Sequence, residues 1–346
     1  MLANPAYSQL AYIQLVVFGD SFSDSGNNAV VFGAERTPVP LTPPDIIPAA
    51  PYQSERYSNG PVWAEQLAEE LGLGVVASLL GGTNYAYGGA RVWQRVSPTE
   101  SLSLPSQVAQ YLSDTGGVAF SGSLYVIEGG GNDARDVLNA LAAGEPGKAA
   151  KIIIEFKNNI GAMITKLSNA GATDFLIWNV PDVGLAPAVQ AQGQIAILLA
   201  TFVAKTMNVF LDRALDRLEH NLPIDIFRFD AFSFIDAVVA NPQAFGFDNA
   251  SDPCAVSPVC INDPGEHSFW DGLHPTTAGH GAIAQAVLQV LPNAVSAPNA
   301  VARTGEPQPA GARSALDGLA RPSQAALLMS TVQSLTRHLT APPEPR

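Results

Sequence analysis

The stretch Tyr12-Ile-Gln-Leu-Val-Val-Phe-Gly-Asp-Ser21 joins a short, largely apolar run to a turn sequence. Residues 124–128 form a second run of this kind, which also leads into glycines. Short apolar runs bounded by turn residues are typical of buried strands. We therefore predict that both segments are strands inside a sheet and that Ser21 lies in the turn that follows the first one.

Candidate helices alternate with candidate strands along the rest of the chain. The expected helices cover residues 62–71, 147–169, 194–218 and 277–291, and further strands are expected at 174–178 and 224–229. Strands that alternate with helices form a parallel sheet with helices on both faces. The predicted fold class is therefore α/β, with three α/β/α layers around a central parallel sheet.

The length of 346 residues fits about two average domains or one large α/β domain. We predict one domain over residues 1–295 and a separate Pro/Ala-rich tail over residues 296–346. Within the tail, residues 314–339 have the pattern of an amphipathic helix, interrupted at Pro322. Residues 32–61 are rich in proline and are expected to form an irregular surface excursion.

The composition excludes several classes of protein. Hydrophobic residues make up 47% and charged residues 14%, which argues against disorder. The net charge of −13 leaves no basic surface for nucleic acid and disfavours attachment to anionic membranes. The longest strongly apolar run, 195–204, has about half the length that crosses a bilayer. We expect neither a nucleic-acid partner nor a transmembrane segment.

The two cysteines, Cys254 and Cys260, are six positions apart in a Pro-containing stretch. So short a loop can bring them within disulfide reach, and two unreactive thiols are the alternative. Zinc would need four ligands, and there is no second cysteine pair. A disulfide would indicate an exported protein. We expect a secreted, periplasmic or cell-surface location, with the leader absent from this chain, because the N-terminus lacks the pattern of a signal peptide.

Three polar residues stand in an order that suggests nucleophilic catalysis. A serine on a tight strand-to-helix turn exposes its hydroxyl, but Ser21 needs a base to become a nucleophile. His274 is preceded by Asp271 at a spacing that lets a carboxylate bind one imidazole nitrogen and leaves the other nitrogen for Ser21. Each motif alone also fits an ordinary turn, a helix cap or a loop salt bridge. Together they predict a Ser-His-Asp triad.

The chain resembles the GDSL lipase/esterase family of the SGNH hydrolase superfamily over residues 12–292. The resemblance rests on four blocks: Phe18-Gly-Asp-Ser-Phe-Ser-Asp-Ser-Gly-Asn27, Asn84-Tyr-Ala-Tyr-Gly-Gly-Ala-Arg91, Gly130-Gly-Asn-Asp133 and Asp271-Gly-Leu-His-Pro-Thr276. Three lesser stretches are typical of the extended-signature bacterial and plant branch: Arg56-Tyr-Ser-Asn-Gly-Pro-Val-Trp63, Asn179-Val-Pro-Asp-Val-Gly-Leu-Ala-Pro187 and Asn241-Pro-Gln-Ala-Phe-Gly-Phe247. The sequence has no G-x-S-x-G elbow, which disfavours an ordinary α/β-hydrolase.

The resemblance implies a flavodoxin-like α/β/α fold and gives each candidate residue a role. Ser21 is expected to be the nucleophile, His274 the general base and Asp271 the residue that orients the base. The family needs no metal and no other cofactor.

The same resemblance implies an oxyanion hole, the set of donors that stabilises the negative oxygen of the tetrahedral intermediate. Its donors would be the Ser21 N–H, the Gly88 N–H and the Asn132 side-chain amide. Gly89 remains an alternative to Gly88, because a single sequence does not fix the register to one residue.

The function expected from these residues is hydrolysis of carboxylic esters, as by an esterase or lipase, through an acyl-enzyme on Ser21. The partner would be a small-molecule or lipid ester, with transient contact with lipid surfaces. Two alternatives remain open: a lipid acyltransferase that uses the same triad, and a catalytically silent binding or adhesion domain. The aromatic residues near the first two blocks either pack a long loop or line an acyl- or alcohol-binding wall: Tyr52, Tyr57, Tyr85, Tyr87 and Trp93.

Overall fold

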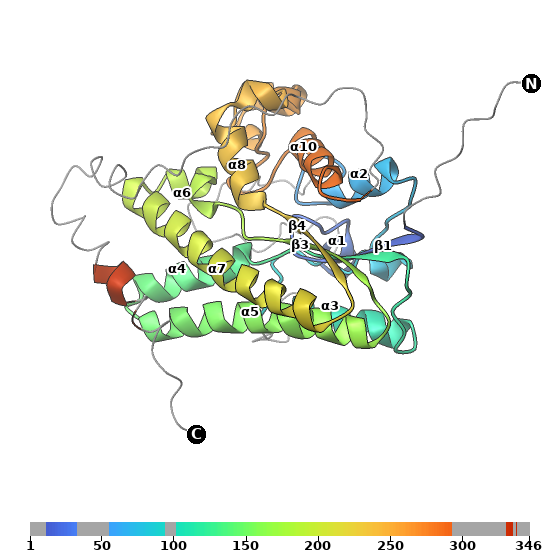
Figure 1. Ribbon diagram of the computed structural model, residues 1–346. Helices are drawn as coiled ribbons and strands as arrows, with labels where there is room; N and C mark the ends of the chain where they lie inside the picture. Colours follow the sequence, from blue (N-terminus) through green and yellow to red (C-terminus); the bar gives the residue numbers. More distant parts are fainter. Residues whose placement is uncertain (1–11, 33–54, 94–101, 293–329, 335–336, 338–346) are drawn as a thin grey trace, which may run out of the picture.

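A computed structural model describes residues 12–32, 55–93, 102–292, 330–334 and 337 (Figure 1). A four-stranded parallel sheet lies at its centre, in the spatial order β1-β2-β3-β4. The strands are β1 (Gln14–Phe18), β2 (Ser123–Ile127), β3 (Asp174–Trp178) and β4 (Asp225–Phe229). The prediction of a parallel α/β sheet is confirmed, with each strand within two residues of its expected bounds.

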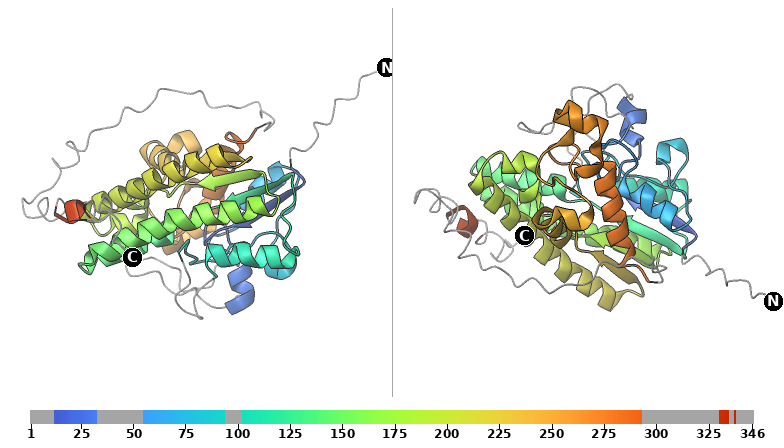
Figure 2. Two further views of the ribbon diagram at one scale, coloured as in Figure 1. Left: turned by 60° about the horizontal axis from the view of Figure 1, so that its bottom comes forward. Right: turned by 90° about the horizontal axis from the view of Figure 1, so that it is seen from above.

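Helices cover both faces of this sheet. The α-helices of the described residues are α1 (Asn27–Phe32), α2 (Trp63–Glu70), α3 (Leu104–Asp114), α4 (Gly131–Ala142), α5 (Pro146–Asn169), α6 (Pro187–Gln190), α7 (Gln194–Asn221), α8 (Ala231–Ala240), α9 (Pro258–Asn262) and α10 (Thr277–Leu288). Helices α3, α4, α5 and α7 pack on one face, and α2 and α10 pack on the other (Figures 1 and 2).

Alternation along the strands explains the two hydrophobic layers. In β1, Val16 and Phe18 belong to the core cluster under α3, α4, α5 and α7, whereas Leu15 and Val17 belong to the cluster under α2 and α10. Successive side chains of a strand point to opposite faces, so an unbroken apolar run is what a strand buried on both faces requires.

Helix α7 is long and apolar enough to cross a membrane by length and composition, with a mean hydropathy of 1.6. A third of that apolar window is buried inside the protein. Ala200, Val203, Met207 and Leu211 are buried at helical spacing, so this face of α7 packs on the core. Helix α7 therefore belongs to the layer of helices that covers this face of the sheet.

The structure does not describe all of the segments predicted from the sequence. Residues 33–54, most of the expected Pro-rich excursion, lie outside the described residues. Of the tail after residue 295, the structure describes residues 330–334 and 337, which are helical. The boundary at residue 295 therefore stays a prediction.

The chain path brings two loops together at one end of the sheet. After β1 the chain passes beside the outer edge of β1, where Tyr85 N donates to Val17 O and Asn84 forms a parallel bridge with Val17. It then crosses back to β2 on the other side of β1. Ligands of open α/β sheets bind at such a switch point, at the carboxyl ends of the strands. The turn that carries Ser21 and the start of α4, which carries Asn132, both lie there.

Candidate active site

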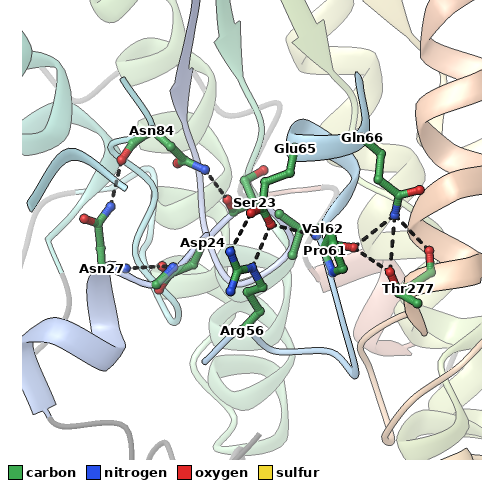
Figure 3. Close-up of polar contacts among 11 residues, drawn as sticks. Ser23, Asp24, Asn27, Arg56, Pro61, Val62, Glu65, Gln66, Asn84 and Thr277 are labelled. Carbon is green, nitrogen blue, oxygen red and sulfur yellow. Dashed lines mark hydrogen bonds and ion pairs between the residues drawn. The ribbon is translucent and has the colours of Figure 1, made fainter. Parts of the chain in front are cut away.

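Hydrogen bonds fix the turn after β1 both before and after Ser21. Asp20 O accepts the Ser23 and Asp24 N–H groups, and Asp20 Oδ1 accepts the Phe22 N–H at 3.1 Å. The Asn84 amide donates to Ser23 O at 2.6 Å, as Figure 3 shows. These bonds fix the backbone on either side of Ser21, which is 7% exposed.

Asp24 anchors the next part of the loop. Its carboxylate accepts the backbone N–H groups of Gly26, Asn27, Asn28 and Gly88 at 2.7–3.3 Å, and Figure 3 shows the bond from Asn27. Burial raises the pKa of Asp24 to about 6, although each of these N–H bonds lowers it. Asp24 therefore ties the first sequence block to the second.

The predicted triad residues lie within hydrogen-bond distance of one another. His274 Nε2 is 2.8 Å from Ser21 Oγ, and His274 Nδ1 is 2.7 Å from Asp271 Oδ2. His274 and Asp271 are 2% and 1% exposed. Asp271 Oδ1 also accepts the N–H groups of Leu273 and His274, which fixes the carboxylate against its own loop. The arrangement can take a proton from the Ser21 hydroxyl.

Two aromatic rings pack against the His274 imidazole. The Tyr57 ring centroid is 5.2 Å from that of His274, and the Phe22 centroid is 5.8 Å away. Asn28 Nδ2 donates to the Tyr57 hydroxyl at 2.7 Å. Tyr57 thus packs against the imidazole of the predicted general base, a contact that the sequence did not distinguish from ordinary loop packing.

A segment before α2 connects the serine loop to the histidine loop. Ser58 Oγ donates to Pro275 O at 2.9 Å, and Asn59 Oδ1 accepts the Thr277 N–H at 2.8 Å. Figure 3 shows Gln66 of α2 donating to Thr277. Trp63 Nε1 donates to Ser23 Oγ at 3.0 Å, on the serine side. Residues 58–66 therefore link the loop that carries Ser21 to the loop that carries His274.

Some of the predicted oxyanion donors already donate a hydrogen bond within the protein, and others do not. Asn132 Nδ2 donates to Asp20 Oδ2 at 3.1 Å and to Ala90 O at 3.0 Å. The Gly88 N–H donates to Asp24. Within the described part of the chain, the Ser21 and Gly89 N–H groups have no hydrogen-bond partner. Of the two glycines, the one with an unengaged N–H is Gly89, whose φ is 79°.

An apolar cavity of about 510 Å³ opens beside Ser21 and His274. Its wall includes Phe22, Trp178, Leu199, Phe229, Phe234 and Ile235. Asn132 and Arg135 also line it, and an Arg135 nitrogen donates to Asn132 Oδ1 at 3.2 Å. The cavity can hold a hydrocarbon chain whose ester carbonyl lies at Ser21.

Two carboxyl groups, those of Glu128 and Asp133, are buried near the site, and the sequence does not predict their charge state. Glu128 follows β2 and lines the cavity, and Asp133 accepts the N–H groups of Val92 and Trp93. Burial raises the pKa of Asp133 to about 7 and that of Glu128 well above its usual value. The sequence signal for Glu128 is a carboxyl residue directly after the apolar run of β2.

Cys254 and Cys260 form a disulfide with a Cα–Cα distance of 5.2 Å. The bridge packs with Tyr57 and Trp270, next to the loop that carries His274. Among the residues that the structure describes, no group of three His, Cys, Asp or Glu side chains is placed to hold a metal ion.

Comparisons with known proteins show which family the chain resembles. A family model described as GDSL-like lipase/acylhydrolase matches residues 15–287. The thermolabile hemolysin of Vibrio parahaemolyticus is 27% identical over 297 residues, which cover 80% of this chain and 63% of that protein. Lipase 1 of Photorhabdus luminescens is 34% identical over 181 residues, which cover 52% of this chain and 24% of that protein. The phosphatidylcholine-sterol acyltransferase of Aeromonas hydrophila is 26% identical over 336 residues, which cover 82% of this chain and 92% of that protein.

The chain thus spans less than two thirds of the length of the first two relatives. The family model, in contrast, covers most of the chain and includes the serine turn and the histidine loop. The chain belongs to the GDSL-like lipase/acylhydrolase family.

Proposed function

We propose that the protein is a serine carboxylic-ester hydrolase that forms an acyl-enzyme on Ser21. One observation carries the proposal: an unbroken chain of hydrogen bonds runs from Ser21 to His274 to Asp271 beside an apolar cavity. Family membership supports ester chemistry, and the cavity supports an acyl substrate.

The reaction follows from the positions of the three side chains. Ser21 Oγ attacks the ester carbonyl carbon while His274 Nε2 accepts the hydroxyl proton, and Asp271 stabilises the imidazolium that forms. The tetrahedral intermediate collapses, the C–O bond to the alcohol breaks, and His274 returns the proton to the leaving alkoxide. Water then attacks the acyl-enzyme with His274 again as base, which releases the acid and restores Ser21.

The developing oxyanion needs donors directed at one point. We assign the Ser21 N–H and the Asn132 amide, and for the third donor the engagement of Gly88 by Asp24 favours Gly89. An oxyanion that accepts an Asn132 hydrogen has to share or take it from Asp20 or from the Ala90 carbonyl.

The cavity favours lipid esters over small, polar ones. It continues to the first turns of α7, where Ile195 and Leu199 line it and remain half-buried. Apolar side chains at a cavity entrance favour transient contact with a lipid surface. The disulfide favours an oxidising location outside the cytosol, so we place the enzyme among secreted, periplasmic or cell-surface proteins.

A lipid acyltransferase is the second candidate, because a lipid alcohol can replace water in the second step. The observation that favours it is the similarity to the phosphatidylcholine-sterol acyltransferase over most of both chains. Measuring acyl transfer to an added sterol or long-chain alcohol, against release of free acid, separates the two.

The experiment is hydrolysis of p-nitrophenyl esters from acetate to palmitate by the wild type, Ser21→Ala and Ser25→Ala. Ser25 is a matched control, because it lies in the same turn and its buried hydroxyl has no hydrogen-bond partner in the described structure. We expect Ser21→Ala to abolish turnover and Ser25→Ala to retain it. Leu199→Trp should fill the cavity and shift the preference toward short acyl chains. Equal turnover by the wild type and Ser21→Ala would refute the mechanism.

A further inference from the structure

Two carboxyl groups, those of Asp20 and Glu128, lie buried next to the nucleophile. They are 3% and 5% exposed, and Glu128 Oε2 accepts the Asp20 N–H at 3.3 Å. Asp20 follows β1 and Glu128 follows β2, so the pairing of adjacent strands brings them together. Gly19 leaves room for the contact, because a Cβ there would lie 2.8 Å from Glu128 Oε2.

The remaining partners of the pair lie in the serine turn and at Asn132. Glu128 Oε2 accepts the Ser23 hydroxyl at 2.8 Å and the Asp20 N–H at 3.3 Å. Asp20 Oδ1 accepts the Phe22 N–H, and its Oδ2 accepts the Asn132 amide at 3.1 Å. Asp20 therefore lies between Glu128 and Asn132 in this set of hydrogen bonds.

The charges that face the pair favour a single shared proton. The Arg135 guanidinium, and the His274 imidazolium once it has taken the Ser21 proton, stabilise the Asp20 carboxylate, whereas the strongest charge acting on Glu128 is that of Asp20 itself. Two carboxylates in contact cannot both ionise without a large electrostatic cost. Burial raises the pKa of both groups, and that of Glu128 the more strongly.

We propose that Asp20 and Glu128 hold one proton between them, with the acid form of Glu128 donating to the Asp20 carboxylate. Glu128 and Asp20 are then positioning residues: they orient the Asn132 amide and keep a second negative charge away from the oxyanion site. This inference rests on the proposed ester hydrolysis. When an oxyanion draws the Asn132 amide away from Asp20, the Glu128 hydroxyl still satisfies that carboxylate.

The test compares Glu128→Gln with Glu128→Leu. Glutamine keeps an oxygen for Ser23 and supplies an N–H in place of the acid O–H, whereas leucine supplies neither. We expect Glu128→Leu to lower kcat by about ten- to hundredfold with little change in KM, because buried groups lose their partner. Glu128→Gln should recover most of that loss.

The pH profile gives a readout that a merely structural role would not move. In the wild type, kcat should fall at alkaline pH as the pair loses its proton, and this fall should be absent in Glu128→Gln, which has no proton to lose. A Glu128→Gln variant as impaired as Glu128→Leu, or one with the wild-type alkaline fall, would overturn the proposal.

Infrared spectroscopy tests the pair without any substrate. At neutral pH the wild type should show the carbonyl band of a protonated carboxylic acid that is missing from the Glu128→Gln spectrum. No difference between the two spectra would overturn the shared proton. The band together with an inactive wild type would refute ester hydrolysis and leave the proton pair in place.

Discussion

Asn132 is the side chain that connects the serine turn to the start of α4. Its amide is the one side-chain donor that we assign to the oxyanion site, and the residue lines the cavity. Asn132→Ala should lower kcat by about 100- to 1000-fold with little change in KM, since the donor acts on the transition state. Kinetics with a p-nitrophenyl ester, with the exposed Asn221→Ala as control, measure this. A loss of less than about threefold would remove Asn132 from the oxyanion site, because one donor contributes far more.

Sequence motifs were enough to select the candidate triad. Ser21 follows a strand in a tight turn, and Asp271 stands three residues before His274, which is the residue pattern that nucleophilic catalysis needs. The proton on Glu128 was beyond reach, since it depends on which carboxyl faces Glu128 across the neighbouring strand. The hydrogen bond from the Gly88 N–H to Asp24 could not be predicted either, because the two residues belong to different sequence blocks. Charge states and donor availability depend on contacts between distant segments.

At the scale of elements, the segment that leads into α2 should control how well the triad is aligned. Asn59→Ala removes the acceptor of the Thr277 N–H at the start of α10. We expect a loss of about 1 kcal/mol of stability and a lower kcat with an unchanged KM, because α10 begins just after His274. Denaturant unfolding and steady-state kinetics measure both, and Asn59→Asp, which keeps an acceptor oxygen, should be milder. An Asn59→Ala enzyme with wild-type kcat would show that this segment does not align the triad.

The disulfide should stabilise the loop before His274 through its short ring. Cys254 and Cys260 are separated by six positions, and closing so short a loop contributes about 2 kcal/mol in the chain-entropy model. Reducing agent should therefore lower the Tm of the wild type by a few degrees. The double variant Cys254→Ser/Cys260→Ser should start at the lower Tm and not respond to reductant. An unchanged wild-type Tm after complete reduction would show that the bridge adds no stability.

Helix predictions succeeded where periodicity was long and failed where turn residues stood at the start. The helices α2, α5, α7 and α10 lie where their apolar spacing placed them. The sequence reading assigned no helix to α4, because it opens with the Gly-Gly-Gly-Asn run that looks like a turn, and Gly130 indeed has φ 115°. Helix α8 is apolar on most sides, so its sequence lacks the alternation of apolar and polar faces by which a surface helix is recognised.

For the whole molecule, the buried carboxyl groups predict a fold that is more stable in mild acid than at neutral pH. Burial raises the pKa of Asp133 to about 7 and that of Asp236 to about 6, from an ordinary value of 3.8. A group with a raised pKa in the folded state binds its proton more tightly when folded, so its stabilisation is complete below the unfolded pKa and is lost as pH rises through the folded pKa. Tm should therefore fall from about pH 4 to about pH 7.

Asp236→Asn provides the matched control for this prediction. The charge of Asp182 adds to the raised pKa of Asp236, whereas an amide at position 236 carries no proton that titrates. The variant should lose less stability than the wild type between acid and neutral pH. A wild-type Tm that rises over this interval would contradict the assignment of raised pKa values to these groups.

The most direct test of the account is covalent labelling by an alkyl fluorophosphonate, followed by peptide mass spectrometry. An activated serine displaces fluoride and keeps the phosphonyl group, so the account predicts one adduct on the peptide that contains Ser21. His274→Ala should slow the labelling strongly, and Ser21→Ala should abolish it. An adduct on another residue, or equal labelling rates in the wild type and His274→Ala, would contradict a nucleophilic Ser21 activated by His274.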